Sequence, residues 1–284
     1  MLAAGRQLRK QGWTTGWPAV AIALPYAPVG LLKVFVPALK RRHRGKVARL
    51  RARHRVTLVV ERPGVLLTED GFQAAGTRRA PVVAELLRDA ATTRYEGGSV
   101  GGPTRAADVN ALMTRLKAKG QCPLALGTDR GVYKSPAVQA HLAEYLIVWF
   151  PSRPHTPQDN GGMERAVREV EAEAGDLEDL PPEAIAERLG ATTGRLNAYR
   201  VRPSRGGYTA DELTELMPAC DPSVRPRFYA AATAAIAKAV AGASPRQARA
   251  AHREAVMRTM ERFELARRVR GDGTPAPQEA EVLT

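Results

Sequence analysis

The 284-residue chain has little cysteine, and no acidic side chain precedes Glu61. Its two cysteines, Cys122 and Cys220, are too few and too far apart in the sequence for a disulfide framework or a cysteine-based zinc site. They fit a reducing compartment, so we expect a cytoplasmic protein. Because 44% of the residues are hydrophobic, the chain can build a sizeable core and is not globally disordered.

The absence of acidic residues before Glu61 concentrates positive charge at the N-terminus. Of the 43 Lys and Arg residues, 13 lie in residues 1–60, which leaves 30 basic against 29 acidic residues in the rest of the chain. Nine of the 13 lie between Lys40 and Arg55. Such a block attracts polyanions, and nucleic acid is the commonest of them. The alternative is a merely solvated, charged face. The expected DNA contacts are Lys40, Arg41, Arg42, Arg44 and Lys46.

A stretch without charge precedes this block. Residues Gln11–Leu32 follow a short basic segment and resemble a signal peptide or a membrane anchor. Pro18, Pro25 and Pro28 interrupt the stretch and would leave backbone groups unpaired in lipid, so we expect no membrane insertion.

The same stretch predicts two short apolar helices, over residues 17–24 and 28–39, as in a helix-turn-helix. Pro37 should disturb the second helix, and a basic helix or linker should follow over residues 40–55.

From residue 56 the hydrophobic pattern changes to strands that alternate with helices. Strands are expected at 56–60, 64–70, 81–87, 95–100, 122–126 and 146–150, and helices at 104–119, 135–145 and 163–174. This order predicts an α/β core. Further helices are expected at 181–189, 193–199, 211–217, 226–240 and 245–267, followed by a disordered tail over 271–284.

Three carboxylates fall at the ends of these elements. Asp70 ends a strand, Asp129 follows a buried strand, and Glu164 lies in the first turn of a helix after a proline-rich loop. Carboxylates from separate elements can converge at one edge of a sheet, where hard oxygen ligands suit two Mg²⁺ or Mn²⁺ ions. Taken singly, each is an ordinary surface carboxylate, and it is the joint pattern that indicates a site.

Two motifs around these acids carry a family resemblance. Residues Leu124–Gly131 (L-A-L-G-T-D-R-G) resemble "L-x-S-D-N-G", and residues Ser152–Arg165 (S-R-P-H-T-P-Q-D-N-G-G-M-E-R) resemble "P-x-T-P-Q-x-N-G-x-x-E-R". Residues Arg195–Thr209 are similar to the "L-N-x-x-R-P-x-x-x-L-G-x-x-T-P" stretch that follows. Together, over about residues 56–210, the chain resembles the retroviral-integrase-type DDE transposases of bacterial insertion sequences.

The resemblance implies an RNase H-like mixed sheet flanked by helices over residues 56–178. A basic helical arm, with a helix-turn-helix character, would precede it over 1–55, and a helical region would follow over 179–270. It also implies that Asp70, Asp129 and Glu164 hold two Mg²⁺ or Mn²⁺ ions for DNA strand cleavage and transfer. The interval from Asp129 to Glu164 fits the family spacing. The implied partners are double-stranded DNA and further copies of the chain, in a bacterial nucleoid; the need for a helper ATPase is left open.

Some positions depart from the family pattern or compete for a role. Glu69 competes with Asp70, and because neighbours on a strand point to opposite faces, only one of them should reach the metal ions; we favour Asp70. The aromatic residue that usually precedes the first acid is Leu66 or Leu67 in this chain, and Arg130 replaces the usual Asn.

Cations beside the acids are the expected phosphate contacts: Arg130, Arg165, Arg168, Arg202 and Arg205. The alternative for the two on the helix is intrahelical pairing, of Arg165 with Glu169 and of Arg168 with Glu171. His155 and Gln158 should shape the loop beside the site, with His155 in a structural role.

Two other functions stay in view. Arg130, Pro37 and the missing aromatic residue favour a catalytically inactive, decayed or repurposed DNA-binding protein derived from a transposase. An RNase H-like nuclease that cuts DNA without joining it would use the same three acids.

Overall fold

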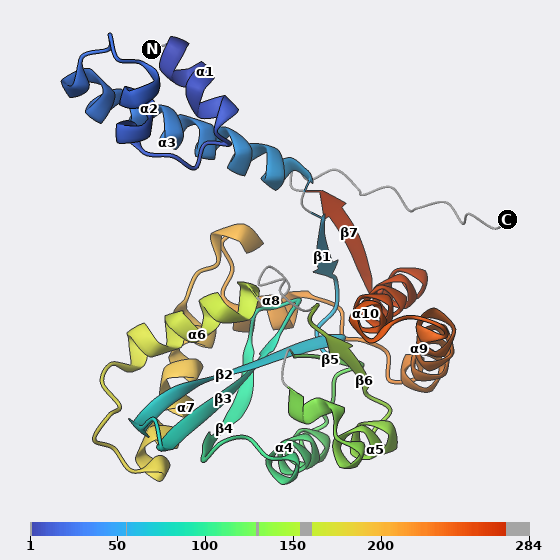
Figure 1. The fold of residues 1–284 in the computed structure, drawn as a ribbon. Helices are drawn as coiled ribbons and strands as arrows, with labels where there is room; N and C mark the ends of the chain where they lie inside the picture. Colours follow the sequence, from blue (N-terminus) through green and yellow to red (C-terminus); the bar gives the residue numbers. More distant parts are fainter. Residues whose placement is uncertain (1, 55, 129–130, 154–160, 271–284) are drawn as a thin grey trace, which may run out of the picture. The chain divides into compact units, whose positions relative to one another are not determined.

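The computed structural model describes residues 2–54, 56–128, 131–153 and 161–270 (Figure 1). The predictions for Asp129, for Arg130, for His155 and Gln158 in the loop and for the tail over 271–284 lie outside these residues. The chain divides into two compact units, Met1–Thr57 with Arg268–Thr284, and Leu58–Arg267. Among the described residues, no helix combines the length and the hydrophobicity that crossing a bilayer requires.

The N-terminal unit contains three helices, α1 (Leu2–Lys10), α2 (Trp17–Ala23) and α3 (Val29–His54). A small apolar cluster joins them: Ala4, Leu8, Val20, Leu32 and Val36. The ring of Trp13 also stacks on His43 of α3, with 3.9 Å between the centroids. The sequence pattern did not predict α1.

The prediction that the second helix ends near residue 39 is wrong, because α3 continues through Pro37 to His54. Pro37 lies on the exposed side of α3, as does Lys33, whose carbonyl loses its helical donor. Water can therefore bind the carbonyl that proline leaves without a partner, and the helix continues.

The second unit is built on a five-stranded sheet of β2 (Leu66–Thr77), β3 (Ala80–Asp89), β4 (Tyr95–Gly101), β5 (Ala125–Thr128) and β6 (Val148–Pro151). The strand order is β4-β3-β2-β5-β6. Strand β3 is antiparallel to β2 and β4, whereas β2, β5 and β6 run parallel. The predicted RNase H-like arrangement is therefore confirmed: an antiparallel meander extended by two parallel strands that helical crossovers connect.

Helices cover both faces of this sheet. Leu87 of β3 packs with the apolar faces of α4 (Ala106–Ala118) and α5 (Pro136–Glu144). Its neighbour Leu86 packs on the opposite face with α6 (Gly161–Ala174) and α7 (Pro182–Tyr199). Helix α7 is continuous where two short helices were predicted, and the hydroxyl of Thr193 donates to the carbonyl of Leu189 within it.

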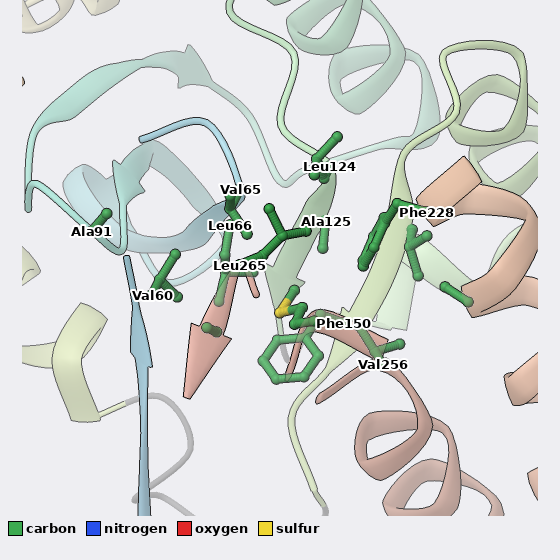
Figure 2. Packing of buried hydrophobic residues seen from close by; sticks show 14 residues of the cluster. Val60, Val65, Leu66, Ala91, Leu124, Ala125, Phe150, Phe228, Val256 and Leu265 are labelled. Carbon is green, nitrogen blue, oxygen red and sulfur yellow. The ribbon is translucent and has the colours of Figure 1, made fainter. Parts of the chain in front are cut away.

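The C-terminal region packs against the parallel half of the sheet, through α9 (Val224–Val240) and α10 (Pro245–Arg262), after the short helix α8 (Ala210–Leu216). Figure 2 shows the shared cluster, in which Leu124, just before β5, and Phe150 of β6 meet Phe228 of α9 and Val256 of α10.

The helix predicted to run to residue 267 ends at Arg262 instead. The chain turns at Glu264, which has a positive φ of 54°, and continues as β7 (Ala266–Arg270). Strand β7 pairs with β1 (Val56–Val60) in a two-stranded sheet, and the backbone N–H of Glu61 donates to the carbonyl of Leu265. Backbone pairing with a strand from the other end of the sequence therefore decides the conformation of this basic segment.

The side chain of Asn197 closes part of the open edge of β4. Its carboxamide accepts a hydrogen bond from the backbone N–H of Tyr95 and donates one to the Tyr95 carbonyl, both at 2.9 Å. Both residues are buried, with 4% and 3% exposure, so this amide replaces a neighbouring strand at that point.

We predict that Asn197→Ala lowers the free energy of unfolding by about 2–4 kcal/mol, because it leaves two buried backbone groups without partners. Urea unfolding of the full chain measures this loss. The matched control is Asn110→Ala, since no described residue hydrogen-bonds the carboxamide oxygen of Asn110. Equal stability of the two variants would contradict the role of Asn197.

A second prediction concerns His252 of α10, whose Nε2 donates to the carbonyl of Trp149 at 2.8 Å. Burial lowers the pKa of His252, although this hydrogen bond partly opposes the shift. The unfolded chain therefore binds the proton more readily, so stability falls as the pH drops below the ordinary histidine range. His252→Gln should reduce the loss of stability between pH 7.5 and 5.5. Identical slopes in wild type and His252→Gln would contradict the prediction.

Candidate active site

Strand β2 brings its acidic residues beside the end of β5. Leu66, Leu67 and Thr68 pair in parallel with Ala125, Leu126 and Gly127. Gly127 permits this close approach, since a Cβ at that position would lie 3.2 Å from Cγ2 of Thr68. Strand β5 ends at Thr128, one residue before Asp129, which lies outside the described residues.

Glu69 and Asp70 lie on opposite faces of the sheet. Glu69 pairs with Leu87, which packs under α4 and α5, and Asp70 pairs with Leu86, which packs under α6. Paired residues of antiparallel strands point to the same face. Asp70 is therefore on the face that α6 covers, where it is half-buried, and Glu69 is fully buried on the other.

The first turn of α6 lies over the same part of β2. The hydroxyl of Thr68 is 3.6 Å from Sδ of Met163, and Nη1 of Arg88 donates to the carbonyl of Gly162 at 3.2 Å. Arg88 is itself paired with Thr68 across the two strands, and its burial lowers the pKa of its guanidinium. Glu164 follows in this first turn, and its side chain is exposed.

The structure thus brings Asp70 and the turn that carries Glu164 to one face of the sheet. Both side chains offer the hard oxygen ligands that Mg²⁺ and Mn²⁺ prefer. Within the described ranges, no three His, Cys, Asp or Glu side chains lie close enough together to hold a metal ion. A site with three carboxylates needs Asp129 as well.

Arg165 and Arg168 lie on the exposed side of α6. Their Nε atoms donate to the carbonyls of Gly161 and Glu164, at 3.1 and 3.3 Å. Glu169 forms its ion pairs with Arg200 and Arg202 instead, so the alternative in which it pairs with Arg165 is not what the structure contains.

Arg202 and Arg205 make contacts within the protein. Nη1 of Arg202 donates to both carboxylate oxygens of Glu169, at 2.6 and 2.7 Å, and only 11% of its side chain is exposed. Nη2 of Arg205 donates to the carbonyl of Ala90 at 2.9 Å. These guanidiniums hold the segment after α7 against α6 and against the turn between β3 and β4.

The predicted DNA contacts of the N-terminal unit differ among themselves. Nζ of Lys40 donates to the carbonyls of Thr14 and Thr15, at 3.2 and 3.0 Å, and so ties the loop before α2 to α3. The other four predicted contacts have exposed side chains: Arg41, Arg42, Arg44 and Lys46.

Sequence reasoning missed Tyr95 and Glu169 as neighbours of this site. The hydroxyl of Tyr95 lies 3.0 Å from Oε2 of Glu169 and 3.1 Å from the carbonyl of Ala166, both on α6. The sequence pointed to their partners only, because Asn197 and Arg202 lie in the stretch that follows the family motifs. Asn197 contacts Tyr95, and Arg202 contacts Glu169.

No family model matches this chain, and no curated protein matches its sequence. Similar solved structures include the HTLV-2 integrase catalytic core domain in complex with magnesium, with a TM-score of 0.42 and 16% identity over 54% of this chain and 97% of that chain. The catalytic core domain of BIV integrase has a TM-score of 0.42 and 20% identity over 54% and 94%. A simian T-cell lymphotropic virus intasome, in complex with a PP2A regulatory subunit, has a TM-score of 0.44 and 15% identity over 77% and 78%.

Proposed function

We propose that this chain is a DDE transposase of the bacterial insertion-sequence type, which cuts and joins DNA with the carboxylates of Asp70, Asp129 and Glu164. The observation that carries the proposal is the register of β2. It puts Asp70 on the face where α6 begins with Glu164, beside the strand that ends one residue before Asp129.

The three carboxylates would hold two Mg²⁺ or Mn²⁺ ions, whose charge stabilises the attacking and leaving oxygens of a phosphodiester exchange. Two ions need several anionic oxygen ligands, and three carboxylates with DNA phosphates supply them. Glu164 is exposed and lies at a helix N-terminus, so a polynucleotide can approach it directly. Arg165 and Arg168 lie exposed on the same helix and would contact the phosphates of that strand, as would Arg130.

The N-terminal unit would bind the DNA duplex outside the active site. Arg41, Arg42, Arg44 and Lys46 are exposed on α3, and no acidic residue precedes Glu61. Residues 1–55 would form this arm, residues 56–178 the catalytic core and residues 179–270 the helical region that packs on it. Joining two DNA ends requires more than one copy of the chain, so we expect an oligomer on DNA.

A specific observation supports a second candidate function. Arg130 follows Asp129 directly where the family has Asn, and a cation beside the metal site would compete with the ions. This favours a transposase-derived protein that binds DNA and has lost catalysis.

The test incubates the full chain with DNA carrying the ends of its element, a target plasmid and Mg²⁺ or Mn²⁺. We predict joined products, with at least a 100-fold loss of rate in Asp70→Asn, Asp129→Asn and Glu164→Gln, since lost metal ligands remove about 3 kcal/mol or more of barrier lowering. The matched control is Glu171→Gln, on the exposed side of the same helix, which should stay within a few-fold of wild type.

Cleavage without joining would favour the nuclease. Tight DNA binding with neither product would overturn the enzymatic proposal in favour of the inactive DNA-binding protein.

The salt dependence of DNA binding tests the N-terminal arm. Each neutralised phosphate contributes about −0.9 to the slope of log K against log salt, so replacing the four exposed cations at 41, 42, 44 and 46 by Gln should flatten the slope by up to about 4. Asp129→Asn should leave the slope unchanged. If both changes alter the slope alike, the N-terminal unit is not the principal DNA contact.

A further inference from the structure

One flank of α6 is tied to the antiparallel half of the sheet at three successive turns. Arg88 donates to the carbonyl of Gly162 at 3.2 Å, and the hydroxyl of Tyr95 lies 3.1 Å from the carbonyl of Ala166. The same hydroxyl lies 3.0 Å from Oε2 of Glu169, on the third turn. At about 100° per residue, positions 162, 166 and 169 lie within about 60° of one another on the helix.

Charge holds the last of these contacts in place. Burial alone would raise the pKa of Glu169, but the hydrogen bonds and the charge of Arg202 outweigh it, and the net pKa is lowered. The carboxylate is therefore ionised at neutral pH. Burial raises the pKa of Tyr95, so its hydroxyl keeps the proton that it donates. Removing one partner from a buried ion pair is far more disruptive than removing an exposed one.

Arg202 lies on a segment that several hydrogen bonds hold in place. Its backbone N–H donates to the carbonyl of Tyr208 at 2.9 Å and forms the closing bridge of the turn after α7. Arg205 anchors this turn to the carbonyl of Ala90, and Asn197 anchors the end of α7 to the backbone of Tyr95. The position of Arg202 is thus set by the same strands that carry Tyr95 and Arg88.

Glu164 lies on the opposite flank of the helix from this stripe. It is about 160–170° away from the mean direction of positions 162, 166 and 169, so the rotation of α6 about its axis decides where its carboxylate points. We propose that Arg202, with Tyr95 and Glu169, is a positioning device that fixes this rotation and so holds Glu164 for metal binding. This inference rests on the proposed function.

The experiment compares full-length Arg202→Met with wild type, and uses Arg200→Met as its matched control. Arg200 binds the same carboxylate at 3.1 Å, but 62% of its side chain is exposed. Three quantities are measured: Mn²⁺ affinity without DNA, hydrogen exchange of the α6 amides with those of α10 as internal reference, and the Mg²⁺ concentration that half-saturates strand transfer.

For Arg202→Met we expect Mn²⁺ affinity to fall by about 10-fold or more, as for other groups that orient a metal ligand. Exchange should quicken in α6 but not in α10. The Mg²⁺ requirement should rise while the KM for DNA stays unchanged. Arg200→Met should remain within about twofold of wild type, because exposed ion pairs contribute little. Should Arg202→Met fail to fold, Tyr95→Phe and Arg202→Lys provide the milder perturbations, with the same direction of change expected.

Wild-type Mn²⁺ affinity in folded Arg202→Met, Arg202→Lys and Tyr95→Phe would overturn the positioning role, even if urea sensitivity rises, since that combination means a merely structural contact. A wild-type protein that binds no Mn²⁺ and joins no DNA would overturn the proposed function itself. The two failures are therefore distinct.

Discussion

The side-chain alternation of β2 is the constraint on which the proposed site depends. This strand pairs with β3 on one side and β5 on the other, so its register is fixed from both edges. A slip of one residue would exchange the faces of Glu69 and Asp70 and would turn Thr68 away from Met163. The apolar residues of β2 itself oppose such a slip, because Leu67 is buried in the cluster under α4 and α5, whereas Phe72 packs against the cluster under α6 and α7.

Helix α6 carries Glu164, another carboxylate of the proposed site, and it is held by polar contacts as well as by packing. Its apolar face, which includes Met163 and Val170, lies on the sheet. An apolar face alone permits some rotation and sliding, whereas hydrogen bonds have fixed partners and directions. Arg88 of β3, which donates to the carbonyl of Gly162, and the hydroxyl of Tyr95 of β4, which Ala166 and Glu169 share, add that directional constraint. The exposed flank with Glu164 remains open to a large ligand.

The sequence predicted the α/β core well because its strands and helices are short, regular and separated by proline, glycine or polar turns. It failed where a distant contact decided the local structure. The predicted helix ran from residue 245 to 267, whereas pairing with β1 makes residues 266–270 a strand. Helical spacing offered Arg165 as one alternative partner for Glu169, but its partner Arg202 lies beyond the end of the next helix. The face of Asp70 could be argued from alternation, but only the partners of β2 identify it as the face of α6.

The central claim is that the carboxylates of Asp70, Asp129 and Glu164 share metal ions while Glu69 does not. Anomalous scattering from crystals of the full chain soaked in Mn²⁺ tests it most directly. The account predicts Mn²⁺ peaks bound by all three of these carboxylates and none at Glu69. A peak at Glu69, or no peak at saturating Mn²⁺, would contradict it.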